Sequence, residues 1–177
     1  MEHRITLPLS ADFDMLQIKA GDKVLLSGTV FTARDAAHKK LVELLDAGRA
    51  LPVDLRGAAV YYTGPTPAKP CEPIGSCGPT TSYRMDCYTP RLLDLGLAVM
   101  IGKGPRGKEA VDSMVRNGAI YLAATGGAGA LFQACVTSCE VVAFGELGAE
   151  ALMRLEVSDM PLICAVDARG ASLYNKP

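Results

Sequence analysis

The feature that most restricts the fold is a repeated order of apolar segment, glycine turn and helical pattern in the second half of the chain. Residues 97–101 are apolar without a break, which is typical of a strand that is buried on both faces. A glycine-rich turn over 102–107 and a helical pattern over 108–116 follow. The same order then begins again, with a predicted strand over 119–125 and a short helix over 130–135. Alternating strands and helices indicate an α/β fold, in which helices flank a sheet.

The first half of the chain fits this fold class. Residues 23–32 are rich in Val, Leu and Thr and predict a strand, and residues 32–35 resemble a capping box that starts a helix reaching to about residue 45. Further short elements are predicted: strands over 4–9, 57–62, 141–144, 153–157 and 161–166, and a helix with Thr89 as N-cap and Pro90 after it. Because several β segments crowd together late in the chain, we predict a mixed sheet core rather than a uniformly parallel one.

The size and charge of the chain limit its partners. Its 177 residues, 49% of them hydrophobic and 21% charged, are enough for one sizeable core, and a single domain over 1–177 is predicted. With 18 basic and 19 acidic residues and no basic stripe, nucleic acid is not expected as a partner. No apolar run approaches the length of a membrane span, and residues 1–13 lack the apolar core of a signal peptide. The sequence therefore predicts a cytoplasmic protein that does not bind a membrane.

The chain has six cysteines: Cys71, Cys77, Cys87, Cys135, Cys139 and Cys164. Without an export signal they are expected to be reduced thiols rather than a disulfide framework. The gaps between the first three match no common spacing of iron or zinc ligands, and no histidine lies nearby in sequence, so no metal is assigned to this chain. Cys135 and Cys139, four residues apart, are predicted to share one face of a helix as small core side chains.

The stretch with the most polar chemistry is residues 78–86, which place three hydroxyls, a phenol and an arginine behind a Gly-Pro turn. Thr80 or Thr81 can cap a short helix whose first turn carries Arg84. An arginine there opposes the helix dipole, and an anion held by Arg84 and the free backbone N–H groups would resolve the conflict. This favours a binding loop for an anion. The alternative is an ordinary capped turn with a solvated arginine.

Cationic side chains recur where predicted strands give way to helices. Arg34, Arg84 and Lys103 each lie beside Gly, Thr or backbone N–H groups, and such junctions gather at one edge of an α/β sheet, where ligands usually bind. Two arginines can clamp carboxylates through two donors each and a lysine adds a point charge, so a small dicarboxylate would fit. Asp35 and His38, next to Arg34, are further candidates for the site, although a lone histidine at such a place is more often structural.

The turn over 102–107 matches GxGxxG but not the rest of a dinucleotide-binding pattern. The next strand ends in Thr125 instead of the acidic residue that would hold a ribose, and Lys103 and Pro105 crowd the turn. Arg106, in the same turn, is interpreted as a solvated surface residue. No GxxxxGK[ST] phosphate loop occurs, and two histidines offer little for a Ser-His-Asp triad. The residues alone thus indicate an anion site with too few acid or base groups for a complete enzyme.

Taken together, several segments resemble the β subunit of two-subunit class I fumarases, the iron–sulfur hydro-lyases, and the related β subunits of L(+)-tartrate dehydratases. The resemblance covers nearly the whole chain and rests on GDKV (21–24), LSGT (26–29), ARDAAH (33–38), YTGPTPAKP (62–70), GPTTSYRMD (78–86), IGKG (101–104) and ATGGAGA (124–130). The PAKP and TGGAG segments are more similar to fumarase chains than to tartrate dehydratase chains.

The resemblance implies the swivelling β/β/α fold. It also implies a partner α subunit that carries a [4Fe-4S] cluster, so that this chain binds no cofactor itself, is active only with its partner and belongs to a homo-oligomer of αβ units. The implied reaction is the reversible hydration of fumarate to (S)-malate. Two alternatives stay open: the β subunit of an L(+)-tartrate dehydratase or of a related 2-hydroxy-dicarboxylate dehydratase, and a non-catalytic module that binds small anions.

Roles for single residues are also implied by the resemblance. Arg34, Arg84 and Lys103 carry over as carboxylate-binding residues, and Thr81 carries over as a substrate contact. Thr80 carries over as the catalytic group that takes part in proton transfer at C3. Because a threonine hydroxyl is a poor base in water, this role needs an activating neighbour, such as a carboxylate supplied by the partner.

Overall fold

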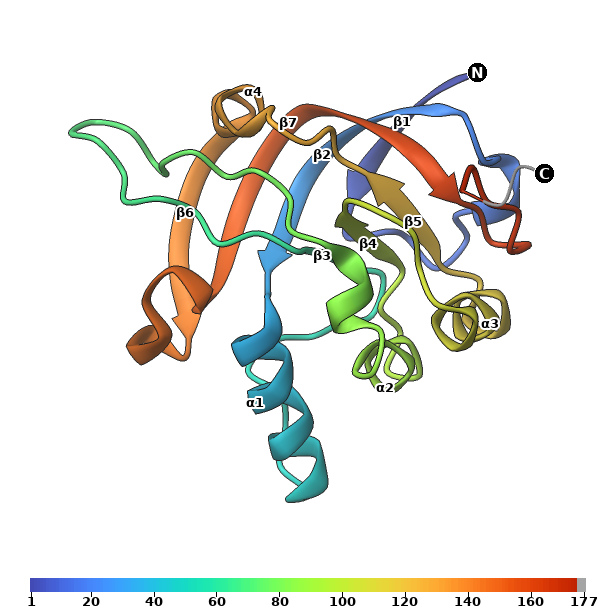
Figure 1. The fold of residues 1–177 in the computed structure, drawn as a ribbon, viewed down its shortest axis with the longest axis horizontal. Helices are drawn as coiled ribbons and strands as arrows, with labels where there is room; N and C mark the ends of the chain where they lie inside the picture. The colour runs from blue at the N-terminus through green and yellow to red at the C-terminus, as the bar shows by residue number, and fades with distance from the viewer. Residues whose placement is uncertain (175–177) are drawn as a thin grey trace.

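The computed structural model describes residues 1–174, in which a mixed β-sheet forms the centre (Figure 1). The strands are β1 (Glu2–Leu7), β2 (Lys23–Thr32), β3 (Ala59–Tyr61), β4 (Val99–Gly102), β5 (Ile120–Ala123), β6 (Val136–Ala143) and β7 (Leu152–Val166). The α-helices are α1 (Asp35–Asp46), α2 (Thr89–Leu93), α3 (Lys108–Asn117) and α4 (Gly129–Ala134). Short 3₁₀ helices are η1 (Met15–Gln17), η2 (Ser82–Met85) and η3 (Gly145–Glu150). The predicted α/β class, with a sheet core and flanking helices, is confirmed.

The domain predicted over 1–177 includes residues 175–177, which lie outside the described residues. Within residues 1–174, no helix combines the length and the apolar character needed to cross a membrane.

Five of the strands pair in a closed ring. The order along the sheet is β1-β2-β3-β4-β5-β7-β6, and β2 also pairs with β7, so that β2, β3, β4, β5 and β7 each have a ring partner on both sides. The strands β2 to β5 run parallel to one another, and β7 runs antiparallel to both β2 and β5. The sheet is mixed, as predicted, and its arrangement is compatible with the swivelling β/β/α fold.

The long strand β2 pairs with two neighbours in succession, and the change from one to the other falls at Gly28. Its residues 23–28 pair with β1, and its residues 30–32 pair with β3. Gly28 has a φ of 99°, and a Cβ atom there would collide with the backbone of Leu7. Glycine alone tolerates both the positive φ and this close approach, so Gly28 sets the point where β2 changes partner.

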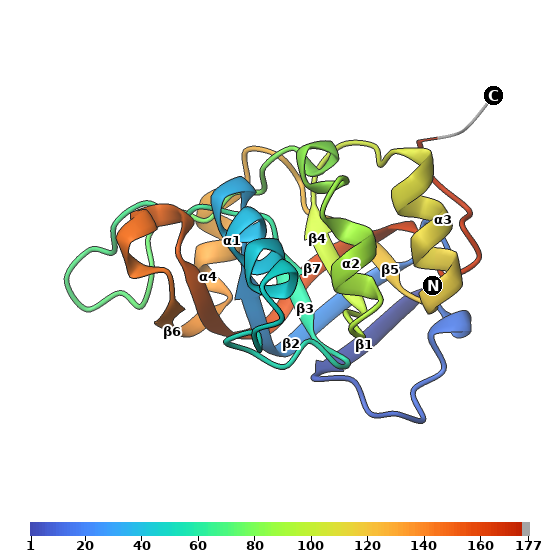
Figure 2. The same ribbon diagram turned by 90° about the horizontal axis from the view of Figure 1, so that it is seen from below.

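Alternate residues of the central strands face two different cores. Tyr61 and Ile101 belong to the core inside the ring, whereas Tyr62 and Met100 face the opposite way and belong to a second core. The second core is covered by α1, α2 and α3, which lie together on one side of the strands (Figure 2). Because side chains alternate along a strand and both faces are buried, the strand sequences are continuously apolar, as residues 97–101 indicate.

Two late segments differ from their predictions. The strands predicted over 153–157 and 161–166 are one strand, β7, which continues through Asp159 in spite of its positive φ of 46°. Pairing with β2 along almost its whole length holds β7 together, and no local pattern reveals that partner. The strand β6 also begins earlier than predicted, so Cys139 lies in a strand and Cys135 is the C-cap of α4. The prediction that these two thiols share a helix face is therefore wrong.

The capping box predicted over 32–35 is also wrong. Thr32 is the last residue of β2, and its Oγ1 donates to the carbonyl of Ala151 at 3.3 Å and accepts from the N–H of Met153 at 3.2 Å. Arg34, predicted in the first turn of the helix, takes the N-cap position of α1 without a side-chain cap bond of its own. The hydroxyl of Thr32 therefore bonds to the segment around β7 instead of capping the helix, and this contact forms only in the tertiary structure.

Candidate active site

The carboxyl ends of the parallel strands β2 to β5 meet at one edge of the sheet. Arg34 follows β2, Lys103 follows β4 and Thr125 follows β5. The loop over 78–86 is fastened to the same edge, since the N–H of Thr80 donates to the carbonyl of Tyr62 at 2.7 Å. Arg34 and Lys103 therefore follow strands that end at this edge, and the loop that carries Arg84 is attached to it.

Backbone bonds hold Thr80 and Thr81 against Lys103. The N–H of Lys103 donates to the carbonyl of Thr80 at 3.3 Å, and the N–H of Ser82 donates to the carbonyl of Lys103 at 2.9 Å. The two backbone segments can approach so closely because Gly102 has no side chain. A Cβ atom at this position would collide with Oγ of Ser82. Thr81 and Lys103 are exposed and Thr80 is half-buried. Two hydroxyls and an ammonium group are therefore presented from neighbouring backbone positions.

Arg84 is oriented by Asp35, which was a candidate residue without an assigned role. Nε of Arg84 donates to Oδ1 of Asp35 at 2.9 Å, and Nη2 donates to Oδ2 of the same carboxylate. One edge of the guanidinium is thus occupied, and the edge at Nη1 is the one that can meet a second carboxylate. Arg84 is the third residue of η2, a 3₁₀ helix of only four residues, whose dipole is correspondingly small. The carboxylate of Asp35, and not the dipole, sets its direction.

Arg34 is held by a carboxylate that sequence reasoning missed. Oε1 of Glu150 lies 3.3 Å from Nη2 of Arg34, and Oε2 of Glu150 accepts from the N–H of Ala36 at 3.1 Å. Glu150 therefore caps α1 and orients Arg34 at the same time. It comes from the end of η3, 114 residues after Ala36, so no local signal in the sequence marks it. Gly64 makes room for the arginine, because a Cβ atom there would lie 2.9 Å from Nη1 of Arg34.

His38 lies beneath the site and does not line it. The ring is fully buried, and its Nδ1 donates to the carbonyl of Arg34 at 2.9 Å. This bond leaves Nε2 as the unprotonated nitrogen, which has no hydrogen-bond partner among residues 1–174. Burial lowers the pKa of His38 to about 4, so the ring is neutral near pH 7. A neutral ring without exposed surface supports Arg34 and does not itself contact a bound ligand.

Arg106 is buried, and its interpretation as a solvated surface residue is wrong. The exposed fraction of its side chain is 0%. Nε donates to Oδ1 of Asp86 at 2.6 Å, and Nη2 donates to Oγ1 of Thr89 at 2.9 Å. The guanidinium also lies over the rings of Tyr62 and Tyr121, at 5.5 and 5.0 Å from their centroids. Thr89, predicted as the N-cap of α2, is the first residue of that helix and serves this arginine.

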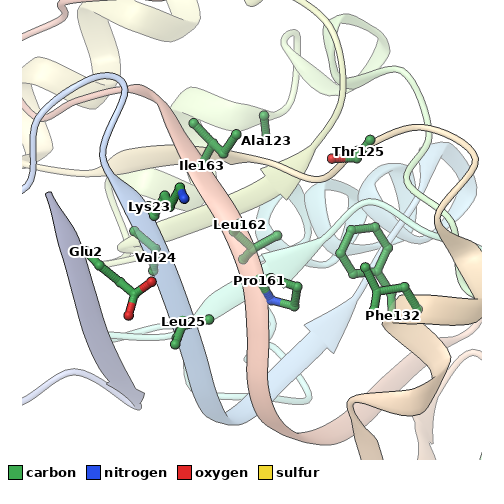
Figure 3. A pocket seen from close by; sticks show the side chains of 11 residues that line it. Glu2, Lys23, Val24, Leu25, Ala123, Thr125, Phe132, Pro161, Leu162 and Ile163 are labelled. Atoms are coloured by element: carbon green, nitrogen blue, oxygen red, sulfur yellow. The ribbon is translucent and has the colours of Figure 1, made fainter.

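A pocket beside α4 differs in character from this edge (Figure 3). Its volume is about 370 Å³, and Val24, Leu162 and Phe132 belong to its mostly apolar lining. A second cavity, of about 500 Å³, opens beside Arg84 and the start of α3 at Lys108. Its lining combines Arg84 and Lys108 with the carboxylates of Asp86 and Glu109 and does not include Arg34 or Lys103, so neither cavity coincides with the cationic edge.

The thiols and carboxylates of the described chain do not fit a metal or an iron–sulfur cluster. Within residues 1–174, no three His, Cys, Asp or Glu side chains form a group that could hold a metal ion. Burial raises the pKa of the Cys77 thiol to about 12, whereas a metal ligand has to be a thiolate. Cys71 and Cys87, which flank it in sequence, are exposed. A cluster would therefore need ligands from elsewhere.

Together the site residues suit a small dicarboxylate. Arg34, Arg84 and Lys103 bring positive charge from separate elements, and Thr80 and Thr81 bring hydroxyls to the same edge. The carboxylates that touch the two arginines are salt-bridged, so they do not offer a free general base. Fold and site thus define a mixed α/β domain with a cationic ligand site at the carboxyl ends of its parallel strands.

Comparison with known proteins narrows this class. The sequence model of the family described as "Fumarase C-terminus" matches residues 2–177. The chain belongs to this family.

The chain is also similar to individual proteins that are named as fumarate hydratases or as a tartrate dehydratase subunit. The chain is 38% identical over 162 residues to "Fumarate hydratase class I, anaerobic" of Escherichia coli, a match that covers 90% of this chain and 30% of the relative. It is 36% identical over 162 residues to "Fumarate hydratase 2" of Leishmania major, covering 90% of this chain and 28% of the relative. It is 39% identical over 169 residues to a Methanocaldococcus jannaschii protein named "Putative L(+)-tartrate dehydratase subunit beta", covering 92% of this chain and 87% of the relative. The chain therefore spans less than a third of the fumarate hydratases that it matches.

Proposed function

We propose that the chain is the β subunit of a two-subunit iron–sulfur hydro-lyase that interconverts fumarate and (S)-malate. The observation that carries the proposal is the meeting of Arg34, Arg84 and Lys103 with the Thr80–Thr81 segment at one edge of the sheet. The match to 87% of a relative named as a β subunit supports a separate partner chain. The proposed complex is a cytoplasmic homo-oligomer of αβ units.

In the proposed reaction this chain binds and orients the substrate. Arg84 meets a substrate carboxylate through its Nη1 edge, and Arg34 and Lys103 neutralise the remaining negative charge. Thr81 contacts the substrate through its hydroxyl. Thr80 moves the proton at C3, which is added to fumarate when water adds across the double bond and is removed from malate in the reverse direction.

Two requirements of this reaction fall to the partner subunit. The hydroxyl of Thr80 is too weak a base to act alone, so a carboxylate of the α subunit would have to activate it. The [4Fe-4S] cluster, for which the described residues provide no ligand group, would supply a Lewis acid from the α subunit.

The isolated chain is expected to be colourless and inactive, and to hydrate fumarate only after anaerobic mixing with a cluster-bearing α subunit. The reason is a complete cationic site without a set of cluster ligands in residues 1–174. Iron analysis and the loss of fumarate absorbance measure the two properties, with the α subunit alone as the control. Stoichiometric iron on the isolated chain would contradict the proposal. If no cluster protein co-purifies from the native host and the chain still binds dicarboxylates, it is a non-catalytic anion-binding module.

A second candidate function is the β subunit of an L(+)-tartrate dehydratase. The 39% identity to the Methanocaldococcus jannaschii protein favours it. A cationic clamp recognises the two carboxylates and is little affected by the groups on the carbons between them, so the site geometry suits both substrates. Comparing kcat/KM for fumarate, a methylated fumarate and tartrate on the reconstituted complex decides between them, because discrimination lies in transition-state binding.

Arg84→Lys is expected to cost about 2 kcal/mol in kcat/KM, or about 30-fold. Lysine keeps the charge but cannot bind Asp35 through one edge and a substrate carboxylate through the other, as the guanidinium does. Steady-state kinetics of the reconstituted complex at equal cluster occupancy measure the loss. Arg116→Lys is the matched control, since Arg116 is an exposed arginine paired with Asp94 at 2.8 Å on α3. Equal costs for the two variants would show that Arg84 is not a carboxylate-binding residue.

A further inference from the structure

Two loops form the proposed site, and a nearly buried carboxylate joins them. We name residues 78–86 the substrate loop and residues 102–107 the lysine loop. Asp86 ends the substrate loop, and its Oδ1 accepts from Nε of Arg106 at 2.6 Å while its Oδ2 accepts from the N–H of Gly107 at 2.6 Å. Both oxygens of this carboxylate are therefore bound by the end of the lysine loop.

A second contact joins the loops at Ser82. Oγ of Ser82 lies 2.9 Å from the hydroxyl of Tyr121, which donates to the carbonyl of Gly104 at 3.0 Å. The N–H of Ser82 donates to the carbonyl of Lys103 at 2.9 Å. Arg84 lies midway between the two contacts, two residues after Ser82 and two residues before Asp86. The lysine loop thus fixes the short segment that carries Arg84 at both of its ends.

Arg106 has no capacity to bind a substrate itself. Its side chain is 0% exposed, and its Nη1 lies against Sδ of Met100 at 3.5 Å while its other nitrogens bind Asp86 and Thr89. The hydroxyl of Thr89 in turn donates to the carbonyl of Met85, the residue that follows Arg84, at 3.0 Å. Arg106 is therefore linked to the backbone around Arg84 by two routes, one through Asp86 and one through Thr89.

We propose that Arg106 is a positioning residue that acts through Arg84. It holds the carboxyl-terminal end of the substrate loop so that the Nη1 edge of Arg84 faces the ligand. This inference rests on the proposed function. Lysine cannot take over the role, because one ammonium group does not bind Asp86 and Thr89 in one plane while lying over two aromatic rings.

A double-mutant cycle on the reconstituted αβ complex tests the proposal. Arg106→Lys is expected to lower kcat/KM about tenfold, and Arg84→Lys about 30-fold, per assembled and cluster-loaded complex at a temperature well below the Tm of each. The double variant is expected to lose little more than Arg84→Lys alone, since Arg106 has no further role once Arg84 is changed. A merely structural arginine would instead give the product of the two losses, about 300-fold.

The control is Arg116→Lys, which is expected to stay within about twofold of the wild type because Arg116 is exposed in the last turn of α3 and pairs with Asp94 instead of a residue of either loop. Arg106→Lys at wild-type kcat/KM, or a multiplicative double variant, would overturn the inference while leaving the proposed function in place. A wild-type complex without any hydro-lyase activity would overturn both.

A milder variant decides the matter if Arg106→Lys does not assemble. Thr89→Val keeps the size of the side chain and removes the hydroxyl that accepts from Nη2 of Arg106 at 2.9 Å and donates to Met85. We expect it to lower kcat/KM about threefold, and to lose this effect when combined with Arg84→Lys. An unchanged kcat/KM in a folded Thr89→Val complex would overturn the inference.

Discussion

Arg106→Met is expected to lower the free energy of unfolding of the isolated chain by about 3 to 5 kcal/mol. The substitution removes one partner of a nearly buried ion pair and leaves the carboxylate of Asp86, which is 13% exposed, without its counter-charge. It also removes a cation from above the rings of Tyr62 and Tyr121 and a donor from Thr89. Breaking such a pair is costly because the remaining charge stays desolvated.

Urea unfolding followed by circular dichroism measures this loss. Arg116→Met is the control, since the Arg116–Asp94 pair is 57% and 53% exposed and should contribute no more than about 1 kcal/mol. Adding Asp86→Asn to Arg106→Met is expected to restore part of the stability, because the uncompensated charge is then absent. Equal costs for the two methionine variants would show that loss of Arg106 does not leave Asp86 as an uncompensated, desolvated charge.

The second large effect is a loss of stability in mild acid that is caused by His38. Burial lowers the pKa of this ring in the folded protein from 6.5 to about 4, so the unfolded chain binds a proton between these pH values and the folded chain does not. Stability therefore falls as the pH drops from about 6.5 to about 4, by about 3 kcal/mol in total, and this contribution levels off below that range.

His38→Gln is expected to remove most of this pH dependence. Glutamine can still donate to the carbonyl of Arg34 but does not titrate. The measurement is the difference in unfolding free energy between the two proteins from pH 7 to pH 4, in which His3 and its partner Asp22 cancel because both proteins contain them. Parallel stability profiles for the two proteins would mean that folding does not lower the pKa of His38.

Much of the fold is readable from local patterns. The strand over 23–32 and the helix that begins at residue 108 are found where the sequence predicts them, because periodicity and glycine turns mark both. The capping box failed because the hydroxyl of Thr32 bonds to the chain at Ala151 and Met153. The two predicted late strands are one strand because β2 pairs along it. In both cases the prediction was wrong because the segment bonds to residues that are distant in sequence.

In the candidate site, too, some features follow from the sequence and others depend on residues that are distant in sequence. The meeting of Arg34 and Lys103 at one edge follows from a general property of parallel strands, and the sequence predicts it. The roles of Glu150 and Arg106 do not follow, because their partners lie on elements whose packing the sequence does not state. The Gly-Pro turn that carries Arg106 favours a solvated side chain, but contacts with Asp86, Thr89 and two tyrosine rings bury it.

The pairing of β2 with β7 has a consequence for how the chain is made. Lys23 lies opposite Ile163 and Thr32 lies opposite Met153, so β2 cannot complete its pairing until β7, which follows much later in the chain, has been synthesised. Until β7 is synthesised, the inner core around Val24 and Leu26 has no cover, and an incomplete chain exposes apolar surface that favours aggregation. Contacts so distant in sequence also make folding slow compared with that of helical proteins. Pairing of β2 with β7, which completes the ring, is therefore the step of folding at which this protein depends most on its cellular surroundings.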